Sequence, residues 1–581
     1  MAKDPENAAA YDVEERRREA QLGPNYKWIA LSNTTLGVLM ATIDSSILII
    51  SLPAIFNGLG VNPLTAGNIT LLIWLLLGYI VVSSVIVVTI GRLSDMFGRV
   101  KLYNLGFAIF AIGSTLLYVV SYTFSGVTAV LMLIAFRLVQ GFGSGFLFAN
   151  STAILVDAFP KNQRGMAMGV NQIVAIVGGV VGLVVGGILS SIDWHLIFLI
   201  SVPVGIMGTI WSYLALHEIA LIKKNQKIDV LGNVTFALAL TIMLLSMTYG
   251  LLPSGNSSAA WLNPYVIGGF ALGLLLLVAF AVIELRANDP MFDIALFRIR
   301  AFSSGILSLF LAGIARGGLQ FMLIIWLQGV WLPLHGVSFM HTPLQAGIDM
   351  IPLLLGFLVM GPLAGHLSDR YGARLLSTAG MAIDVVGFLL LASLPVSFSY
   401  PIFALIIFVI GVGQGMFAAP NTIAVMNAVP PEQRGATSGM RATFINVSFM
   451  FSIIIFFTLL TVGFGSALPS ALYKGLISQG VPSAAAHTIS ALPPTSALFA
   501  ALLGYNPMQT LLPQNVTQQI PQANLTVITG NTFFPNLIAQ PFIHGMHIVL
   551  IVAALMAAVA AVASALSKSR RNKGEAGALL S

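Results

Sequence analysis

The sequence predicts an all-α membrane protein of fourteen transmembrane helices, arranged as two pseudo-symmetric six-helix bundles plus two extra central helices. Three observations indicate this fold class: the composition, the number of long apolar runs, and a repeat within the chain. Of the 581 residues, 57% are hydrophobic and only 8% are charged, whereas about a quarter of the residues in an average soluble domain are charged. We therefore expect a lipid bilayer to surround most of the chain.

Fourteen apolar runs are long enough to cross a bilayer, which takes about 20 residues in a helix. None of them shows the period-two alternation of barrel strands, so they are predicted to be helices. The predicted spans are 28–53, 69–90, 102–121, 127–149, 166–189, 196–216, 229–251, 263–284, 302–327, 345–366, 375–394, 400–420, 436–463 and 542–566.

The Lys and Arg residues predict which side of the membrane each loop occupies. With the N-terminus in the cytoplasm, the inner loops and the two tails hold nearly all of them, and the outer loops hold only Lys474. An odd number of spans would destroy this separation. We therefore expect an integral protein of the plasma membrane with both termini in the cytoplasm. Because the net charge of +7 follows topology, we expect no nucleic-acid partner.

Two stretches of the chain recur at nearly the same spacing. GRLSDMFGR at 91–99 recurs as GHLSDRYGAR at 365–374, and residues 141–169 recur at 411–439. Both copies lie between spans of matching order and orientation, which predicts a parallel duplication of a six-span unit. The spans 229–251 and 263–284 fall between the copies and belong to neither.

The expected organisation therefore has five parts. They are a cytoplasmic N-terminal segment at 1–27, a first six-helix bundle at 28–216, two extra helices with linkers at 217–301, a second bundle at 302–566, and a basic cytoplasmic tail at 567–581. The second bundle includes a long extracellular loop, 464–541, which is rich in Pro, Ser, Thr, Gln and Asn.

The repeated loop between the second and third spans carries a charged and glycine-rich pattern. Its glycines allow a tight turn and close helix approach, and its Asp is placed to cap a helix or to pair with the following Arg. A plainer interpretation is a basic loop that only fixes topology. The candidate latch residues in the two copies are Gly91, Asp95, Gly98, Arg99, Asp369, Arg370 and Gly372.

Two charged residues lie near the middle of predicted spans. On insertion scales a charge at mid-bilayer costs about 2.5–3.5 kcal/mol, so Asp44 and Arg137 must face a cavity or a partner. Arg137 shares a helical face with Gln140. A carboxylate balanced between burial and a nearby arginine can take up and release a proton. We expect Asp44 to be the proton site and Arg137 its partner; a static buried ion pair is the alternative.

These motifs together resemble the major facilitator superfamily, and more closely its fourteen-span drug:proton antiporter branch. The resemblance covers nearly all of 28–566 except the long loop. It implies that the 91–99 loop and its copy latch the two halves in the outward-facing state, and that Arg137 takes part in proton coupling. The first-span sequence DSSILIISLP at 44–53 resembles a branch motif, with Ser46 and Ile49 in place of the usual Thr and Asn.

The fifth span is similar to the antiporter motif that ends G-P-x-x-G-G. Gly182, Gly186 and Gly187 are present, but Leu183 occupies the proline position, which weakens the inference of antiport. The glycines alone favour close helix packing in lipid.

Other polar residues within the spans are candidates for a substrate cavity. Arg316 has Gln320 on the same face, and either Asp349 or Asp384 is placed to pair with it. Both acids fit a structural role equally well. The full set of cavity candidates is Gln140, Arg316, Gln320, Asp349, Asp384, Gln414, Phe417 and Asn421.

The sequence contains no catalytic motif, cofactor pattern or metal-ligand spacing, so we expect neither an enzyme nor a cofactor or metal site. The function that fits best is a monomeric secondary active transporter, in which protons drive export of amphipathic, lipophilic or cationic small molecules by alternating access. One alternative is an exporter or flippase for lipids or hydrophobic metabolites. A non-transporting receptor or scaffold is a further one.

Overall fold

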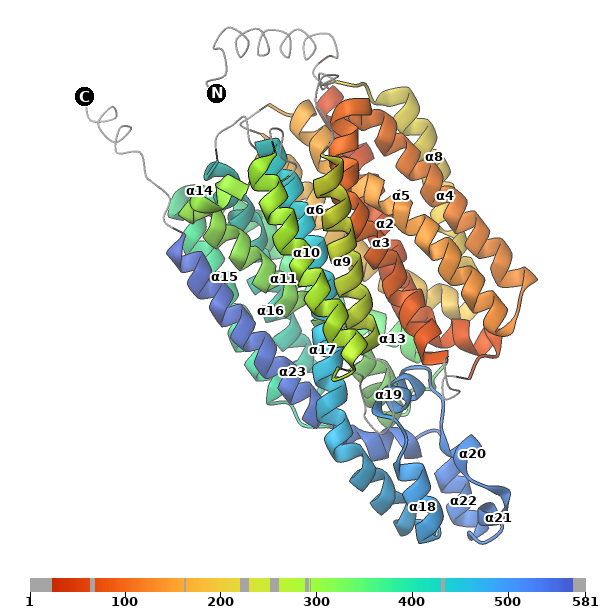
Figure 1. Cartoon of the computed structure of the whole chain (residues 1–581). Helices are drawn as coiled ribbons and strands as arrows, with labels where there is room; N and C mark the ends of the chain where they lie inside the picture. Colours follow the sequence, from red (N-terminus) through yellow and green to blue (C-terminus); the bar gives the residue numbers. More distant parts are fainter. Residues whose placement is uncertain are drawn as a thin grey trace, which may run out of the picture.

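A computed structural model of the chain is helical throughout the part it describes. The described residues are 23, 25–62, 68–160, 163–219, 229–250, 261–287, 292, 294–429 and 434–567. Most of the predicted N-terminal segment at 1–27 and of the tail at 567–581 lies outside them. Figure 1 shows the long helices running side by side.

Fourteen helices in the described residues are long and apolar enough to cross a membrane, which confirms the predicted spans. The first bundle consists of α2 (Tyr26–Leu59), α3 (Asn68–Phe97), α4 (Arg99–Thr123), α5 (Gly126–Ala158), α6 (Arg164–Ile192), and α7 (Leu196–Leu199) with α8 (Ser201–Ala215). The second consists of α11 (Arg300–Trp326), α13 (Thr342–Asp349) with α14 (Ile351–Tyr371), α15 (Ala373–Ala392), α16 (Tyr400–Asn427), α17 (Arg434–Ser478) and α23 (Phe533–Leu566).

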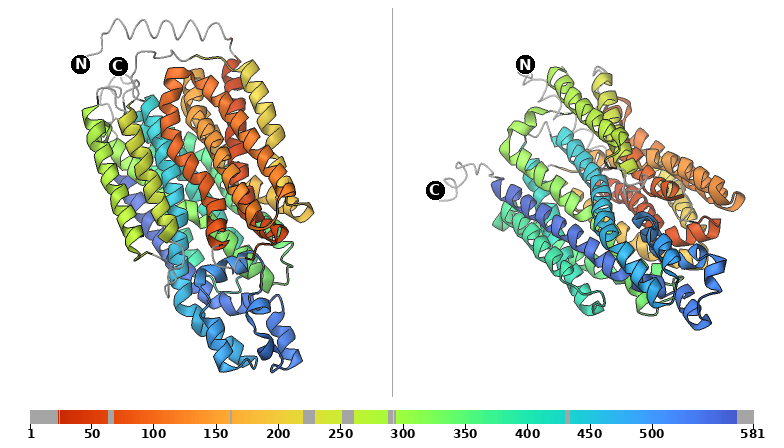
Figure 2. Two further views of the ribbon diagram at one scale, coloured as in Figure 1. Left: turned by 45° about the vertical axis from the view of Figure 1, so that its right-hand side comes forward. Right: turned by 60° about the horizontal axis from the view of Figure 1, so that its bottom comes forward.

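The two extra helices, α9 (Val230–Gly250) and α10 (Pro264–Arg286), pack against each other. Only α9 also packs on α3, and α10 is mostly exposed, as expected of a helix that faces lipid. The left view of Figure 2 shows this yellow-green pair at one edge of the molecule.

The ninth span does not end as an α-helix. After Trp326 the chain forms one turn of π-helix, η2 (Leu327–Trp331), and then the short α12 (Leu332–Leu334). All five residues of η2 are buried. Such π-helical turns are rare and occur frequently at functional sites.

The segment 464–541 is far more helical than the predicted loop. α17 continues to Ser478, and α23 begins at Phe533. Between them lie α18 (Ser483–Ser490), α19 (Pro494–Leu502), α20 (Met508–Leu511), α21 (Gln514–Thr517) and α22 (Gln522–Thr529). The prolines that suggested a loop are helix starts, because proline suits the first positions of a helix; the N-cap residues of the five short helices are Pro482, Pro493, Pro507, Pro513 and Pro521.

The short helices lie at one end of the molecule, which we call the far face, opposite the end where α2 begins and α23 ends (Figure 1). We call the end where α2 begins and α23 ends the terminal face. Tyr26 at the start of α2 donates a hydrogen bond to the carbonyl of His217 there (2.9 Å). Ser564 at the end of α23 accepts one from Thr378 near the start of α15 (3.3 Å). The described chain ends therefore share one face.

Close packing of α2 on α6 depends on glycines. A Cβ on Gly178 would meet the Thr42 hydroxyl, and a Cβ on Gly182 would lie 2.5 Å from the Ile43 carbonyl oxygen and would also meet the Ser46 hydroxyl. Gly186 faces Ile47 and Ile50 in the same way. These glycines allow the two backbones to approach closely, as small residues do in membrane proteins.

The equivalent pair of helices in the second half, α11 and α17, also packs closely, but the glycines are on the other helix of the pair. Here the glycines are on α11, where Gly313 faces the Ser448 hydroxyl and Gly317 faces Phe449 and Ser452 of α17. An offset of 271 residues takes Thr42 to Gly313 and Ser46 to Gly317, and an offset of 270 takes Gly178 to Ser448 and Gly182 to Ser452. The two copies thus place the small residues on opposite helices.

Candidate functional site: a buried ion pair beside a cavity between the two halves

Asp44 on α2 and Arg137 on α5 form a salt bridge in the interior of the first half. Each residue is only 1% exposed. Arg137 Nη1 donates to Asp44 Oδ2 and, at 2.5 Å, to Gln140 Oε1. Gln140 Nε2 donates to Asp44 Oδ1 at 2.8 Å. The structure thus brings together the three residues that the sequence analysis placed near mid-membrane.

Three further residues complete this cluster. Ser114 Oγ on α4 accepts a hydrogen bond from Gln140 Nε2 (2.8 Å), and Ser201 Oγ at the start of α8 donates to Asp44 Oδ1 (3.4 Å). The Tyr79 ring lies 4.5 Å from Arg137 Cζ, where its π face attracts the cation. The sequence analysis missed the serines because a serine in an apolar span often bonds only to its own helix, as Ser114 also does with the Phe110 carbonyl.

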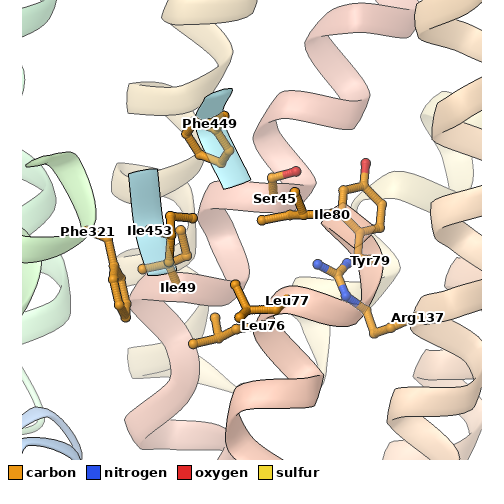
Figure 3. Close-up of a pocket in the computed structure, with 10 residues that line it drawn as sticks. All are labelled: Ser45, Ile49, Leu76, Leu77, Tyr79, Ile80, Arg137, Phe321, Phe449 and Ile453. Atoms are coloured by element: carbon orange, nitrogen blue, oxygen red, sulfur yellow. The ribbon is translucent and has the colours of Figure 1, made fainter. Parts of the chain in front are cut away.

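A small cavity of about 30 Å³ lies beside Arg137. Figure 3 shows the Arg137 guanidinium next to the Tyr79 ring at one wall, and apolar side chains around the rest. Both halves contribute to the lining, which consists of Ser45, Ile49, Leu76, Leu77, Tyr79, Ile80 and Arg137 from the first half and Phe321, Phe449 and Ile453 from the second. A cavity of this size holds about two water molecules, whereas organic ligands occupy roughly 300–1,000 Å³. Substrate entry therefore requires the halves to separate.

The halves are in tight contact on the far-face side of this cavity. A Cβ on Gly187 of α6 would lie 2.5 Å from Leu344 Cα of α13, and one on Gly347 would lie 3.0 Å from the Leu183 carbonyl. Gln328 in the π-helix donates to the Ile50 carbonyl of α2 (3.4 Å). Helix α19, in which every residue is buried, packs on η2 and α17 of the second half and on α3 of the first.

In the second half, Arg316 interacts with Asp384 rather than with Asp349. The opposite charges of Arg316 and Asp384 attract each other, but no salt bridge within 4 Å joins them. Asp349 instead accepts a hydrogen bond from Gln345 on its own helix (2.9 Å). Gln320 lies between the halves, with its Nε2 4.0 Å from the position of a Cβ on Gly179.

The three candidates on α16 lie inside the second bundle. Gln414, Phe417 and Asn421 are all buried, and none of them lines the cavity beside Arg137. Asn421 donates to the Gly305 carbonyl of α11 (3.2 Å). In this conformation Asn421 therefore links α16 to α11.

Both copies of the repeated loop turn at a glycine. Gly98 and Gly372 have φ angles of +106° and +86°, a conformation that favours glycine. Arg99 has a carboxylate partner on another helix: its Nη1 contacts both carboxylate oxygens of Asp157 at the end of α5, at 2.6 and 2.7 Å. A Cβ on Gly91 would meet nothing within 4 Å, so no close helix approach depends on that residue.

The side chains of Asp95 and Asp369 lie outside the described parts of the chain. The Arg370 guanidinium lies 5.6 Å from the Tyr371 ring. The repeat aligns Arg99 with Ala373 and Asp157 with Asn427, so the second copy lacks the groups that form this salt bridge.

Glu218, which follows α8, is a latch-loop partner that the sequence analysis missed. Its Oε2 accepts a hydrogen bond from the Val100 backbone N–H (2.9 Å) and thereby caps the start of α4. Burial raises the pKa of the Glu218 carboxyl, whereas the hydrogen bonds from the backbone of Val100 and Arg99 partly oppose that rise. A glutamate so far along the chain from the loop gave no sequence signal.

A duplicated six-helix unit, with a buried ion pair and a cavity between its halves, defines the class of secondary transporters that rock around a central site. The chain belongs to the Major Facilitator Superfamily, whose sequence profile matches residues 34–453. It is therefore an integral membrane protein that transports a small molecule, and not an enzyme.

The relatives agree with this assignment. The chain is 31% identical to the riboflavin transporter RibZ of Clostridioides difficile (strain 630), over 74% of this chain and 87% of the relative. It is 25% identical to the multidrug transporter protein MdtP of Bacillus subtilis (strain 168), over 85% of each chain. The family match and the multidrug relative are consistent with the fourteen-span multidrug efflux type.

Solved structures support the fold. The crystal structure of a bacterial homolog to the human lysosomal transporter Spinster, in an inward-facing and unoccupied conformation, matches with a TM-score of 0.54. The match covers 94% of this chain and 98% of that chain, at 16% identity.

Proposed function

We propose that this protein exports amphipathic, lipophilic or cationic compounds from the cytoplasm in exchange for protons, with Asp44 as the proton carrier. The observation that carries the proposal is the Asp44–Arg137 salt bridge at the wall of a cavity formed by both halves. The Asp44 carboxylate is sealed from bulk solvent, and its partner Arg137 lines a space large enough for about two water molecules.

Protonation of Asp44 changes the forces within the first half. The neutral carboxyl loses its Coulomb attraction to Arg137, which keeps its hydrogen bond to Gln140 and its contact with the Tyr79 ring. The link between α2 and α5 is thereby weakened. Because α2 also packs on α6, and α6 contacts α13 of the second half, the proton changes the contact that closes the far face. This chain of contacts couples proton binding to alternating access.

The membrane orientation follows from the same proposal. The terminal face carries Arg99, Glu218 and the described chain ends, and the charge distribution of the loops supports a cytoplasmic position for it. The protein would act as a monomer in the plasma membrane, since each chain contains both halves of the transport path. The relative named for multidrug transport supports drugs as the class of substrate.

The test is drug efflux from proteoliposomes under an imposed pH gradient. Asp44→Asn is expected to abolish gradient-driven efflux. Because it leaves Arg137 buried without its salt-bridge partner, it is also expected to lower the melting temperature, so efflux is compared only at temperatures where the variant remains folded. The matched control is Asp193→Asn, because Asp193 is an acid on the loop between α6 and α7, remote from the cavity. Full coupled efflux by Asp44→Asn would reject the proton role of Asp44.

Export of hydrophobic metabolites is a second candidate, and one comparison favours it: the relative with 31% identity is named a riboflavin transporter. The same vesicles, loaded in turn with a cationic dye, riboflavin and a fluorescent phospholipid, discriminate between the candidates. Transport of riboflavin or phospholipid without the dye would replace multidrug export as the function.

A further inference from the structure

Arg316 in the second half is equivalent by the repeat to a residue of the first half that lines the cavity. The offset of 271 residues that aligns α2 with α11 takes Ser45 to Arg316 and Ile49 to Gln320. Ser45 and Ile49 both line the cavity between the halves. Phe321, the residue after Gln320, also lines it, as Figure 3 shows. Arg316 is not among the residues that line the cavity in this conformation, but the duplication gives it the position equivalent to Ser45, one helical turn from Gln320.

The guanidinium of Arg316 is much less well satisfied than that of Arg137. Arg137 donates to two acceptors, the Asp44 carboxylate in a salt bridge and the Gln140 side-chain oxygen. Among the residues that the structure describes, none accepts a hydrogen bond from Arg316 or forms a salt bridge with it; Asp384 attracts it only from a greater distance. A guanidinium carries five N–H donors, and leaving them unfilled inside a membrane protein is costly. Arg316 therefore has donors available for a ligand.

Asp384 is held back from the cavity by its packing. It is 2% exposed, and its Oδ1 has no hydrogen-bond partner in the described residues. The carboxylate lies against Gly413 of α16, where a Cβ would collide with Oδ1. Asp384 thus partly neutralises the charge of Arg316 without accepting a hydrogen bond from it. The guanidinium therefore remains free to turn toward the cavity.

The remaining walls are apolar and partly aromatic: Leu76, Leu77, Phe321, Phe449 and Ile453 lie around the same space. A ligand that satisfies both parts has a flat apolar body and a carboxylate, because a guanidinium binds a carboxylate through two parallel hydrogen bonds. We propose that Arg316 is the anion-binding residue of the transport cavity, and that the cavity accepts aromatic organic acids, with Asp384 as the counter-ion of Arg316 when the site is empty. This inference rests on the proposed function only in taking this cavity as the substrate site.

The test is equilibrium binding to the full-length protein in lipid nanodiscs, measured calorimetrically without any gradient. The probes share one naphthalene ring: 2-naphthoate, its methyl ester, and 2-naphthylmethylammonium. Wild type is expected to bind 2-naphthoate most tightly. Arg316→Gln is expected to weaken 2-naphthoate binding by about tenfold or more, the loss of one charge-assisted hydrogen bond, with little change for the ester. Arg316→Lys is expected to restore part of the affinity, since it keeps the charge.

Two further variants complete the test. Asp384→Asn is expected to bind 2-naphthoate more tightly than wild type, because it removes the competing anion. Arg286→Gln, at the exposed end of α10, is the control and is expected to bind like wild type. If Arg316→Gln fails to fold, Asp384→Asn decides the question.

The inference is overturned if wild type binds the three probes equally or fails to bind 2-naphthoate, if Arg316→Gln keeps full affinity, or if Asp384→Asn leaves the affinity unchanged. The proposed function fails in a different way. Carboxylate-selective binding without gradient-driven efflux would retain the anion site and reject proton-coupled export, whereas coupled efflux without carboxylate selectivity would reject the anion site alone.

Discussion

At the scale of single residues, the ion pair between Asp44 and Arg137 is surrounded by hydrogen-bonding groups. Gln140 contacts both members of the pair, Ser201 donates to Asp44, and Ser114 accepts from Gln140, whereas the buried Arg137 Nε has no partner in the described residues. Such a pair is costly to break from one side, because the remaining charge stays buried.

That cost predicts that a variant lacking one member of the pair is less stable than a variant lacking both. Arg137→Gln is expected to destabilise the protein by about 3–5 kcal/mol, the usual cost of leaving one buried charge unpaired. Adding Asp44→Asn is expected to restore much of that stability, since no charge then remains. Thermal unfolding of the purified proteins in detergent gives the comparison. A double variant no more stable than Arg137→Gln alone would contradict the prediction, and the Asp44→Asn single variant completes the cycle from which the coupling energy is calculated.

The buried carboxyl of Glu218 at the terminal face predicts that the stability of the folded protein depends on pH. Because burial raises the pKa of Glu218 in the folded protein, the folded state favours the protonated carboxyl more than the unfolded state does. The stabilising effect of protonation is complete below the ordinary carboxyl pKa and is lost as the pH rises through the raised pKa.

A Glu218→Gln variant, which cannot ionise, is therefore expected to become more stable relative to wild type as the pH rises through that range. Melting temperatures of the two proteins between mildly acidic and neutral pH provide the measurement, and Asp193→Asn serves as a control, since hydrogen bonds from Tyr122 and His195 outweigh burial and lower the pKa of Asp193. A constant difference between wild type and Glu218→Gln would contradict the prediction.

At the scale of helices, the contact between α2 and α6 leaves no room for a side chain at Gly182. Gly182→Ala is expected to cost about 1–3 kcal/mol, as overpacking does, because the new methyl group would collide with the Ile43 carbonyl and the Ser46 hydroxyl. Gly268→Ala on α10 is the matched control, since a Cβ there would meet nothing within 4 Å. Melting temperatures measure both. A Gly182→Ala protein as stable as the Gly268→Ala protein would refute close packing at this position.

The helices also show what the sequence predicts well. Each span was predictable because a run of about 20 apolar residues has few alternatives to a membrane helix. The helical content of 464–541 was not, because composition alone does not distinguish a proline within a loop from one that starts a helix. The π-helical turn at Leu327–Trp331 likewise has no residue pattern that would have predicted it.

The same contrast holds for the candidate site. Asp44 and Arg137 were predictable as partners because charges within apolar spans are rare. Ser114, Ser201, Asp157 and Glu218 were not, since their roles depend on which helices are neighbours and on the rotation of each helix about its axis. The sequence also left open whether Arg316 faces Asp349 or Asp384, and the packing of the second bundle favours Asp384.

At the scale of the whole molecule, the far face is closed by contacts that join the two halves. Helix α19 packs on both of them, and Asn62 of the first half lies 3.4 Å from the Tyr505 hydroxyl just beyond α19. If transport requires the halves to part at this end, α19 must leave at least one of its two contact surfaces.

An engineered disulfide tests which of the two surfaces α19 leaves. A Cβ on Gly329 would lie 3.3 Å from Ala501 Cβ, close to the roughly 3.5–4.5 Å of a disulfide, and the chain has no cysteine of its own. Because this disulfide joins α19 to η2 within the second half and leaves α19 free to separate from α3 of the first half, the oxidised Gly329→Cys/Ala501→Cys protein is expected to keep its efflux. Each single-cysteine protein is the control. Loss of efflux on oxidation, with recovery on reduction, would mean that α19 leaves the π-helix during the cycle.

The exchanged glycines record how the two halves have diverged. A duplicated unit begins as two identical copies, yet here Thr42 and Ser46 face Gly178 and Gly182, while Gly313 and Gly317 face Ser448 and Ser452. At least one copy has therefore changed both sides of the contact together. A chimera that puts the α11 residues on α2 would set glycine against glycine and leave a void, and one that puts the α17 residues on α6 would set hydroxyl against hydroxyl. Each helix therefore fits the partner in its own half and not the equivalent helix of the other half.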